Sequence, residues 1–143
     1  MNEASDETEI RRVVNAWAGA IRAKDADGVV AHTSPKSVGF FLAPPLQAHG
    51  QLKENLNEWF KTFQGPIGLE IRELKISVGG DVAFCHSLNR ISGRRTNDEE
   101  TDIWVRETLG LRKIDGRWLI THEHESVPFY MDGSNRAAVD LKP

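Results

Sequence analysis

The second half of the chain contains four long runs with the composition of β-strands, and turn chemistry separates each run from the next. The runs span 67–78, 82–92, 101–113 and 118–125. They are separated by Gly79-Gly80-Asp81, by a polar loop over 93–100 and by Asp115-Gly116. The last of these dipeptides is a strong signal for a tight hairpin turn. The pattern therefore predicts an antiparallel sheet of four hairpin-connected strands.

The N-terminal segment predicts one long amphipathic helix. Its apolar side chains fall on one helical face: Ile10, Val13, Val14, Trp17 and Ile21. Asp6 and Glu9 have the spacing of a capping box, so we expect Asp6 to cap the helix. Since one apolar helix face can cover only one side of a sheet, the helix constrains how the sheet can fold.

Between this helix and the four runs, the chain predicts three shorter elements. A short helix passes through Val29 and Val30, and a short strand covers 38–42. A third helix is expected from about residue 51 until Gly65-Pro66 stops it. Its apolar face consists of Leu52, Leu56, Trp59, Phe60 and Phe63.

These elements predict an α+β fold in which a curved antiparallel sheet wraps around the N-terminal helix and leaves a conical hollow at one end. We expect a single domain over 1–143, with 129–143 as a C-terminal tail that has no clear period. The convex face of such a sheet must pack against another part of the chain or another subunit. We therefore expect a homodimer that forms through this face.

Composition excludes several classes of protein. The chain has 143 residues, with 18 Lys+Arg against 21 Asp+Glu, and a net charge of −3. Without a basic block, no nucleic-acid partner is expected. The longest apolar stretch, over 38–46, is far shorter than the about 20 residues of a membrane span, so no membrane partner is expected. The acidic N-terminus lacks the order of a signal peptide, and a single cysteine excludes an intramolecular disulfide. We expect a cytoplasmic protein.

Four short motifs occur in an order that resembles a known superfamily. They are Trp17 to Gly28, His49-Gly50 before a helix, Gly80-Asp81-Val-Ala83, and Asp115-Gly116-Arg-Trp118 leading to His122-Glu-His124. Together they resemble the nuclear-transport-factor-2-like superfamily, and within it the SnoaL-like proteins and ketosteroid isomerase homologues. The last hairpin is also similar to the association domain of calcium/calmodulin-dependent kinase. The resemblance implies a cone-shaped sheet with a pocket, in proteins that range from isomerases, cyclases and dehydratases to binding modules.

Steroid isomerisation itself is not expected. A true ketosteroid isomerase needs a carboxylate base, a Tyr and a protonated Asp. The resemblance places Trp17 at the Tyr position, and the segment 41–43, where the base would fall, contains no acid. The oxyanion acid would fall within 107–109. Two of the three roles are therefore missing or in doubt.

The second long strand supplies candidates for ligand binding. Phe84, His86, Leu88 and Arg90 share one face, opposite Ala83, Cys85, Ser87, Asn89 and Ile91. The resemblance places the first set in the hollow. Arg90 would then bind a carboxylate through its planar fork, His86 would help to anchor the ligand or move a proton, and Leu88 would line the wall. The alternative is that Arg90 is a surface arginine near the end of the strand.

The third long strand supplies a candidate catalytic carboxyl. Glu107 shares a face with Val105 and Leu109, so it would lie in the hollow with a pKa raised by burial. That predicts a general acid or base, and the alternative is a structural ion pair. A β-bulge would instead bring Trp104 and Arg106 inside.

The last strand leaves two alternatives open. Hydrophobic patterning favours the face of Trp118, Ile120, His122 and His124, whereas the resemblance favours the face of Leu119, Thr121, Glu123 and Glu125. We expect Glu123 inside, as a second catalytic candidate. His122 and His124 could chelate a metal, but no motif places a third ligand, so neither a metal nor a cofactor is expected.

The remaining candidates are aromatic. Trp59 on the third helix is expected in the pocket wall, and Trp17 in the core with its indole N–H as a donor at the pocket floor. The sequence thus predicts a pocket for a small organic ligand that could carry a carboxylate. The chemistry expected is cofactor-independent proton transfer, as in an isomerase, cyclase or dehydratase. The alternative is a non-catalytic ligand-binding or protein-association module.

Overall fold

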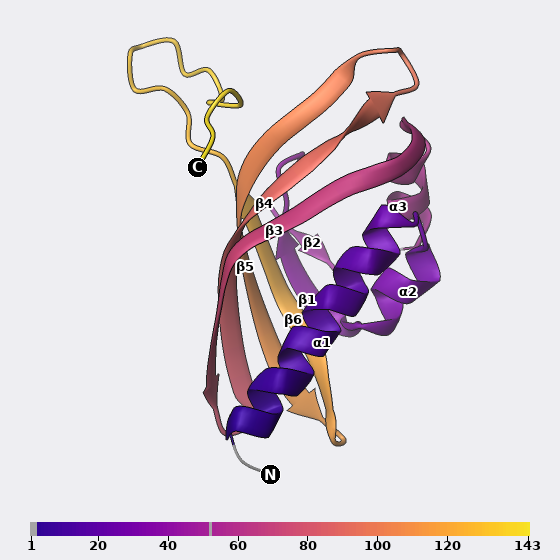
Figure 1. Cartoon of the computed structure of the whole chain (residues 1–143), viewed down its shortest axis with the longest axis vertical. Coiled ribbons are helices and arrows are strands. Elements are labelled where there is room, and N and C mark those ends of the chain that lie inside the picture. Colours follow the sequence, from indigo (N-terminus) through magenta and orange to yellow (C-terminus); the bar gives the residue numbers. More distant parts are fainter. Residues whose placement is uncertain (1–2, 52) are drawn as a thin grey trace.

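The computed structural model of the chain describes residues 3–51 and 53–143, and it has the α+β architecture that the sequence predicts (Figure 1). Leu52, expected on the third helix, lies outside the described residues. The helices are α1 (Glu3–Arg22), α2 (Ala26–Ala31) and α3 (Lys53–Phe60). The strands are β1 (Thr33–Phe40), β2 (Ala48–His49), β3 (Phe63–Gly79), β4 (Val82–Arg95), β5 (Glu100–Ile114) and β6 (Arg117–Ser126).

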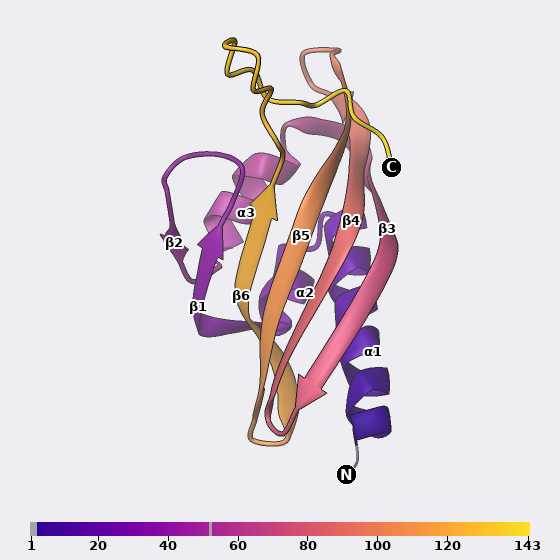
Figure 2. The ribbon, with the colours of Figure 1, turned by 90° about the vertical axis from the view of Figure 1, so that its left-hand side faces the viewer.

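All strands belong to one curved sheet with the order β2-β1-β6-β5-β4-β3. Strands β3 to β6 pair antiparallel through successive hairpins, whereas β1 pairs parallel to β6. Figures 1 and 2 show that α1 runs along one face of the sheet while the other face has no helix over it. The sheet is open, since β3 and β2 form its two edges.

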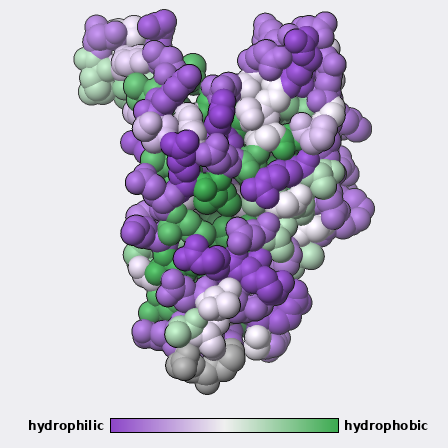
Figure 3. All heavy atoms as spheres, viewed as in Figure 1, coloured by the Kyte–Doolittle hydropathy of each residue, from purple (hydrophilic) through white to green (hydrophobic). Residues whose placement is uncertain are grey.

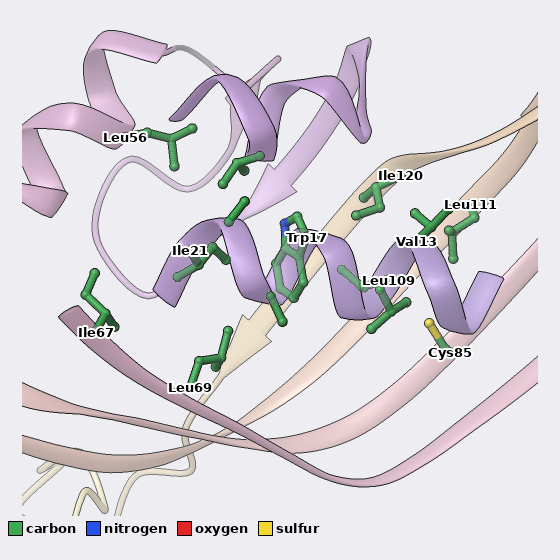
Figure 4. Close-up of a cluster of buried hydrophobic side chains, with 14 of the residues drawn as sticks. Val13, Trp17, Ile21, Leu56, Ile67, Leu69, Cys85, Leu109, Leu111 and Ile120 are labelled. Carbon is green, nitrogen blue, oxygen red and sulfur yellow. The ribbon is translucent and has the colours of Figure 1, made fainter. Parts of the chain in front are cut away.

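The apolar stripe of α1 packs against the inner face of the sheet, as its spacing predicts. Ile10, Val13, Val14 and Trp17 are all buried. They join strand residues such as Leu109 and Ile120 in one core, which Figure 4 shows together with Leu56 of α3. The third helix is shorter than expected. It ends at Phe60, and Phe63, expected on its apolar face, begins β3 instead.

The predicted capping box at Asp6 is wrong, because α1 begins at Glu3 and Asp6 lies inside it. The Asp6 carboxylate accepts hydrogen bonds from Trp118 Nε1 at 3.1 Å and from Lys113 Nζ at 3.2 Å. The hydrogen bond from Trp118 lowers the pKa of Asp6, and Lys113 lowers it further. Asp6 therefore ties the start of α1 to the β5–β6 hairpin.

Strand β6 contains a bulge that answers the question left open for the last strand. Gly110 pairs with His122 whereas Leu111 pairs with Ile120, so Thr121 is an extra residue on β6. Before the bulge, Trp118 and Ile120 point into the core. The extra residue reverses the alternation, because neighbouring side chains of a strand point to opposite faces. Each of the two alternatives therefore holds for one half of the strand.

The C-terminal tail folds back on itself beyond β6. Phe129 and Ala137 form an isolated antiparallel bridge, and the Tyr130 hydroxyl donates a hydrogen bond to Asp140. In Figure 1 the tail extends past the end of β6 and stands apart from the β4–β5 hairpin. Of the helices in the described part of the chain, none is long and apolar enough to cross a membrane.

Candidate functional site

A cavity of about 630 Å³ lies between the inner face of the sheet, the helices and the segment that follows β1. Most of its wall is apolar. The helices contribute Trp17 and Ile21 of α1 and Leu56 and Trp59 of α3. The loop after β1 contributes Phe41 to Pro45. The sheet contributes Ile67, Leu69, Ile91 and Ile103. A cavity of this size and composition is typical of a site for a small organic molecule.

Three carboxyl groups from two neighbouring strands meet in this apolar wall. Glu107 of β5 and Glu125 of β6 are direct cross-strand partners. Glu123, two residues before Glu125 on β6, faces the same cavity. One carboxylate oxygen from each lies within 4.8 Å of the other two. The bulge at Thr121 brings the two β6 glutamates to the same face as Glu107. We name Glu107, Glu123 and Glu125 the carboxyl cluster.

The environment of the carboxyl cluster favours protonation of its members. Glu107 is 3% exposed, and its Oε1 has no hydrogen-bond partner among the described residues. Burial raises its pKa well above the ordinary 4.5, and the charges of Glu123 and Glu125 raise it further. Burial also raises the pKa of Glu123 to about 7 and that of Glu125 to about 8. In the described part of the chain, no Lys, Arg or His forms an ion pair with any of the three. Three negative charges at this distance would repel one another strongly.

Other polar groups lie close to the carboxyl cluster. Asn89 of β4 lines the cavity and is 3% exposed, and its Oδ1 accepts a hydrogen bond of 2.7 Å from the Ser87 hydroxyl. The amide NH₂ of Asn89 offers two donors that can serve a ligand. The backbone N–H of Leu42 donates to the Glu125 carboxyl and lowers its pKa against the effect of burial.

The carboxyl cluster is also the set of described side chains that could hold a metal ion. Three carboxylates suit a hard divalent cation that prefers oxygen ligands. The histidine pair considered for this role lies elsewhere. Its His122 Nδ1 is 2.6 Å from the backbone oxygen of Val38, and both His122 and His124 pack edge-to-face on Phe40.

The structure brings together four of the residues that the sequence singled out. Trp17, Trp59, Glu107 and Glu123 all line the cavity. The inward direction predicted for Glu107 and Glu123 is therefore confirmed, while their chemical roles stay a prediction. The alternative of a structural ion pair at Glu107 finds no partner among the described cations.

The predicted inward face of β4 is wrong. Phe84, His86, Leu88 and Arg90 lie on the outer side of the sheet, whereas Ala83, Cys85, Ser87, Asn89 and Ile91 point inward and are buried. Arg90 makes a bidentate pair with Asp102 at 2.7 Å, on the face away from the cavity. The prediction failed because it rested on the resemblance, whose strand register does not carry over to β4 of this chain. Cys85 is buried in the core, and burial raises the pKa of its thiol to about 11.

Among the cavity residues that the sequence analysis missed, three bear on the chemistry of the site. Glu125 was noted only as a member of a strand face, Asn89 was placed on the outer face of β4, and Arg95 was assigned to a polar loop. Strand β4 extends to Arg95, three residues beyond the predicted end at 92. Continued alternation from Ser87 through Asn89 and Ile91 would have placed Arg95 on the same face.

Residues 10–130 match the model of the SnoaL-like domain family, so the chain belongs to this family. It is similar to an NTF2-like protein of unknown function from Pseudomonas putida KT2440. The two are 32% identical, 99% of each chain is covered, and the TM-score is 0.88. Among curated proteins, none gives a significant match.

More distant structures share the fold. A protein of Novosphingobium aromaticivorans with the provisional name scytalone dehydratase is 18% identical over 94% of this chain and 92% of its own, with a TM-score of 0.79. The association domain of the calcium/calmodulin-dependent kinase II of C. elegans is 20% identical over 87% of this chain and 97% of its own, with a TM-score of 0.68. One fold thus supports both enzymes and assembly domains, and function must be argued from the site.

Proposed function

We propose that this protein binds a small organic molecule in its cavity and moves a proton on it without a cofactor, as an isomerase, cyclase or dehydratase does. The observation that carries the proposal is the carboxyl cluster in an apolar wall. The segment 41–43, where a ketosteroid isomerase would have its base, lines the cavity but contains no acid. The carboxyl cluster would therefore supply the acid–base groups.

The cluster provides an acid and a base at the same pH. Glu123 has a pKa of about 7 and Glu125 of about 8, so near neutrality Glu123 is the member that ionises first. An ionised Glu123 can accept a proton from a carbon next to a carbonyl group. A protonated Glu107 or Glu125 can donate one to the oxygen, and groups with pKa values close to the working pH serve best.

Carbon–hydrogen exchange tests this proposal without knowledge of the natural substrate. We expect the protein to catalyse deuterium incorporation next to the carbonyl group of small aryl ketones, such as 2-tetralone and phenylacetone, in D₂O at pH 7.5. Proton NMR would follow the loss of the exchanging signal. The rate should exceed the buffer rate at least about tenfold, a modest part of what general acid–base catalysis supplies.

A variant with a filled cavity is the matched control. Ile103→Trp places a large side chain in the wall without touching the carboxyl cluster. It should bring the exchange rate back to that of the buffer while leaving the fold intact by circular dichroism. Equal exchange by the wild type and this variant would place any activity outside the cavity and contradict the proposal.

The outer face of the sheet favours a second role, association with another copy of the chain. Phe84 is 51% exposed and Val82 49%, and Ile114 lies on the same face of the neighbouring strand. Figure 2 views this side, where the strands lie in front and α1 behind them. Apolar side chains exposed together on one sheet face are typical of interaction surfaces. We propose that this face forms a homodimer.

A charge on this face tests the dimer. Phe84→Asp should weaken self-association at least about tenfold, since each monomer would bury an unpaired carboxylate. Light scattering after size-exclusion chromatography at several protein concentrations would measure the mass. Glu58→Lys, on the exposed side of α3, should leave the mass unchanged. A wild-type mass of about 16.0 kDa at all concentrations would contradict the dimer.

Several expectations from the sequence stay predictions. These are the single domain over 1–143, the cytoplasmic location, and the absence of nucleic-acid and membrane partners.

A further inference from the structure

Arg95 is a positively charged side chain of the cavity wall whose charge has no partner in the described chain. It lines the same cavity as the carboxyl cluster and is half-buried. Its neighbours differ in this respect. Arg90 pairs with Asp102, and Arg94 pairs with Asp98 and Glu100. Among the described residues, no carboxylate lies within ion-pair distance of Arg95.

The guanidinium group of Arg95 is held in place by aromatic packing. It lies over the Phe63 ring, 4.2 Å from the ring centroid, and Phe63 packs edge-to-face on Trp59. Gly93 makes room for this arrangement, since a Cβ at that position would lie 2.9 Å from the Phe63 ring. A cation over an aromatic face is stabilised without losing its hydrogen-bond donors.

The backbone of Arg95 is fixed as well. Its N–H donates to the Glu99 oxygen at 2.8 Å, and its carbonyl accepts from Gln64 Nε2 at 2.9 Å. The planar fork of the guanidinium is therefore preorganised, which reduces the entropy lost when it binds a carboxylate. The β4–β5 turn next to it forms a hydrophilic end of the molecule (Figure 3).

Arg95 and the carboxyl cluster lie far apart along the sheet. Glu107 is the cross-strand partner of Ser87, and Arg95 follows Ser87 by eight positions (87 to 95). At about 3.3 Å per residue this is roughly 26 Å of extended strand, which curvature and the reach of the side chains shorten. The wall between the two ends contains the apolar side chains of Ile91 and Ile103.

We propose that Arg95 binds the carboxylate of an elongated, largely apolar ligand whose other end lies at the carboxyl cluster. The buried, apolar surroundings of the cluster disfavour an anionic group and Arg95 attracts one, so such a ligand enters in one orientation. The proposal deepens the proposed function, because the end of the ligand opposite the carboxylate would be the end on which the proton moves. Arg95 is then the residue that selects the ligand and positions it, rather than one that moves a proton.

Matched ligand pairs test this proposal. The probes are ω-phenylalkanoic acids with four to ten chain carbons and the corresponding primary amides, which have similar shape and no charge. Quenching of tryptophan fluorescence would report binding, since Trp17 and Trp59 line the cavity. The wild type should bind the best acid about 10- to 100-fold more tightly than its amide, as expected for a charge-assisted hydrogen-bonded pair.

Substitutions locate the effect. Arg95→Gln should remove the preference for the acid and leave amide binding unchanged, which also shows that the cavity is intact. Arg95→Lys should keep part of the preference. Arg94→Gln, at the adjacent position with its side chain in ion pairs outside the cavity, is the matched control and should keep all of it.

Three results would overturn the proposal: equal binding of acid and amide by the wild type, an equal loss in Arg94→Gln and Arg95→Gln, or no binding of any probe. Failure of the proposed proton transfer is a separate result. It would appear as an absence of deuterium exchange with binding unaffected. Accordingly, Glu107→Gln should leave the ratio of acid to amide affinity within about threefold of wild type.

Discussion

Replacing Glu107 by glutamine should stabilise the protein at alkaline pH. We expect the free energy of unfolding at pH 8 to rise by about 1–3 kcal/mol, because glutamine cannot ionise and so avoids the cost of keeping a buried carboxyl protonated beside two others. Glutamine has the same shape as glutamate and carries no charge. It therefore fills the same space while removing the repulsion with Glu123 and Glu125.

The raised pKa values of the cluster determine how the stability changes with pH. The pKa values of Glu107, Glu123 and Glu125 are raised in the folded protein, so above about pH 4.5 the folded state binds more protons than the unfolded state. Stability then falls as the pH rises from 4.5 through about 7 and 8. The difference between wild type and Glu107→Gln should be largest at pH 8 and should vanish near pH 4.

Urea unfolding at a series of pH values measures the effect. Glu99→Gln, in the exposed β4–β5 turn, is the matched control and should follow the wild-type curve. If Glu107→Gln were less stable than wild type at pH 8, the hydrogen bond between Glu107 and Glu123 would outweigh the cost of burial and repulsion. The account of the carboxyl cluster given above would then be wrong.

Replacing Glu123 by glutamine should have the largest effect on the proposed chemistry. Glu123 is the member of the cluster that ionises first, so its loss removes the base. The catalysed part of the deuterium exchange should fall about 100- to 10,000-fold, the usual contribution of a positioned base, so the observed rate should return to that of the buffer. Ligand affinity should change little, because the glutamine keeps the shape of the wall.

The pH profile of exchange distinguishes a base from a merely structural residue. The wild-type rate should rise as Glu123 loses its proton near pH 7 and should fall as Glu125 loses its own near pH 8. Glu123→Asp should restore part of the rate with the same profile. A Glu123→Gln variant as fast as wild type would remove this residue from the mechanism.

Most of the fold could be predicted because the periodic patterns are strong and agree with one another. The stripe of Ile10, Val13 and Trp17 defines one helix face, and Asp115-Gly116 defines a hairpin. The boundaries that differ depend on tertiary contacts. Asp6 looked like a cap because its hydrogen-bond partners, Trp118 and Lys113, are more than one hundred positions away.

The site was harder to predict because alternation gives two faces but not which of them is inside. On β5 the choice was clear, since Val105, Leu109 and Leu111 are all apolar. On β4 both faces are mixed, and small residues such as Ala83 and Cys85 give a weak signal although they fill the core. A bulge leaves almost no trace in a sequence, so the register change at Thr121 could not be foreseen.

The bulge at Thr121 divides β6 into two parts with different structural roles. Trp118 and Ile120, on its N-terminal side, anchor the strand to the helix, whereas Glu123 and Glu125, on its C-terminal side, face the cavity. Sequence change after the bulge can therefore alter acidity and specificity without loosening the packing before it. Within one short strand, the residues that pack the core are thus separated from those that line the cavity.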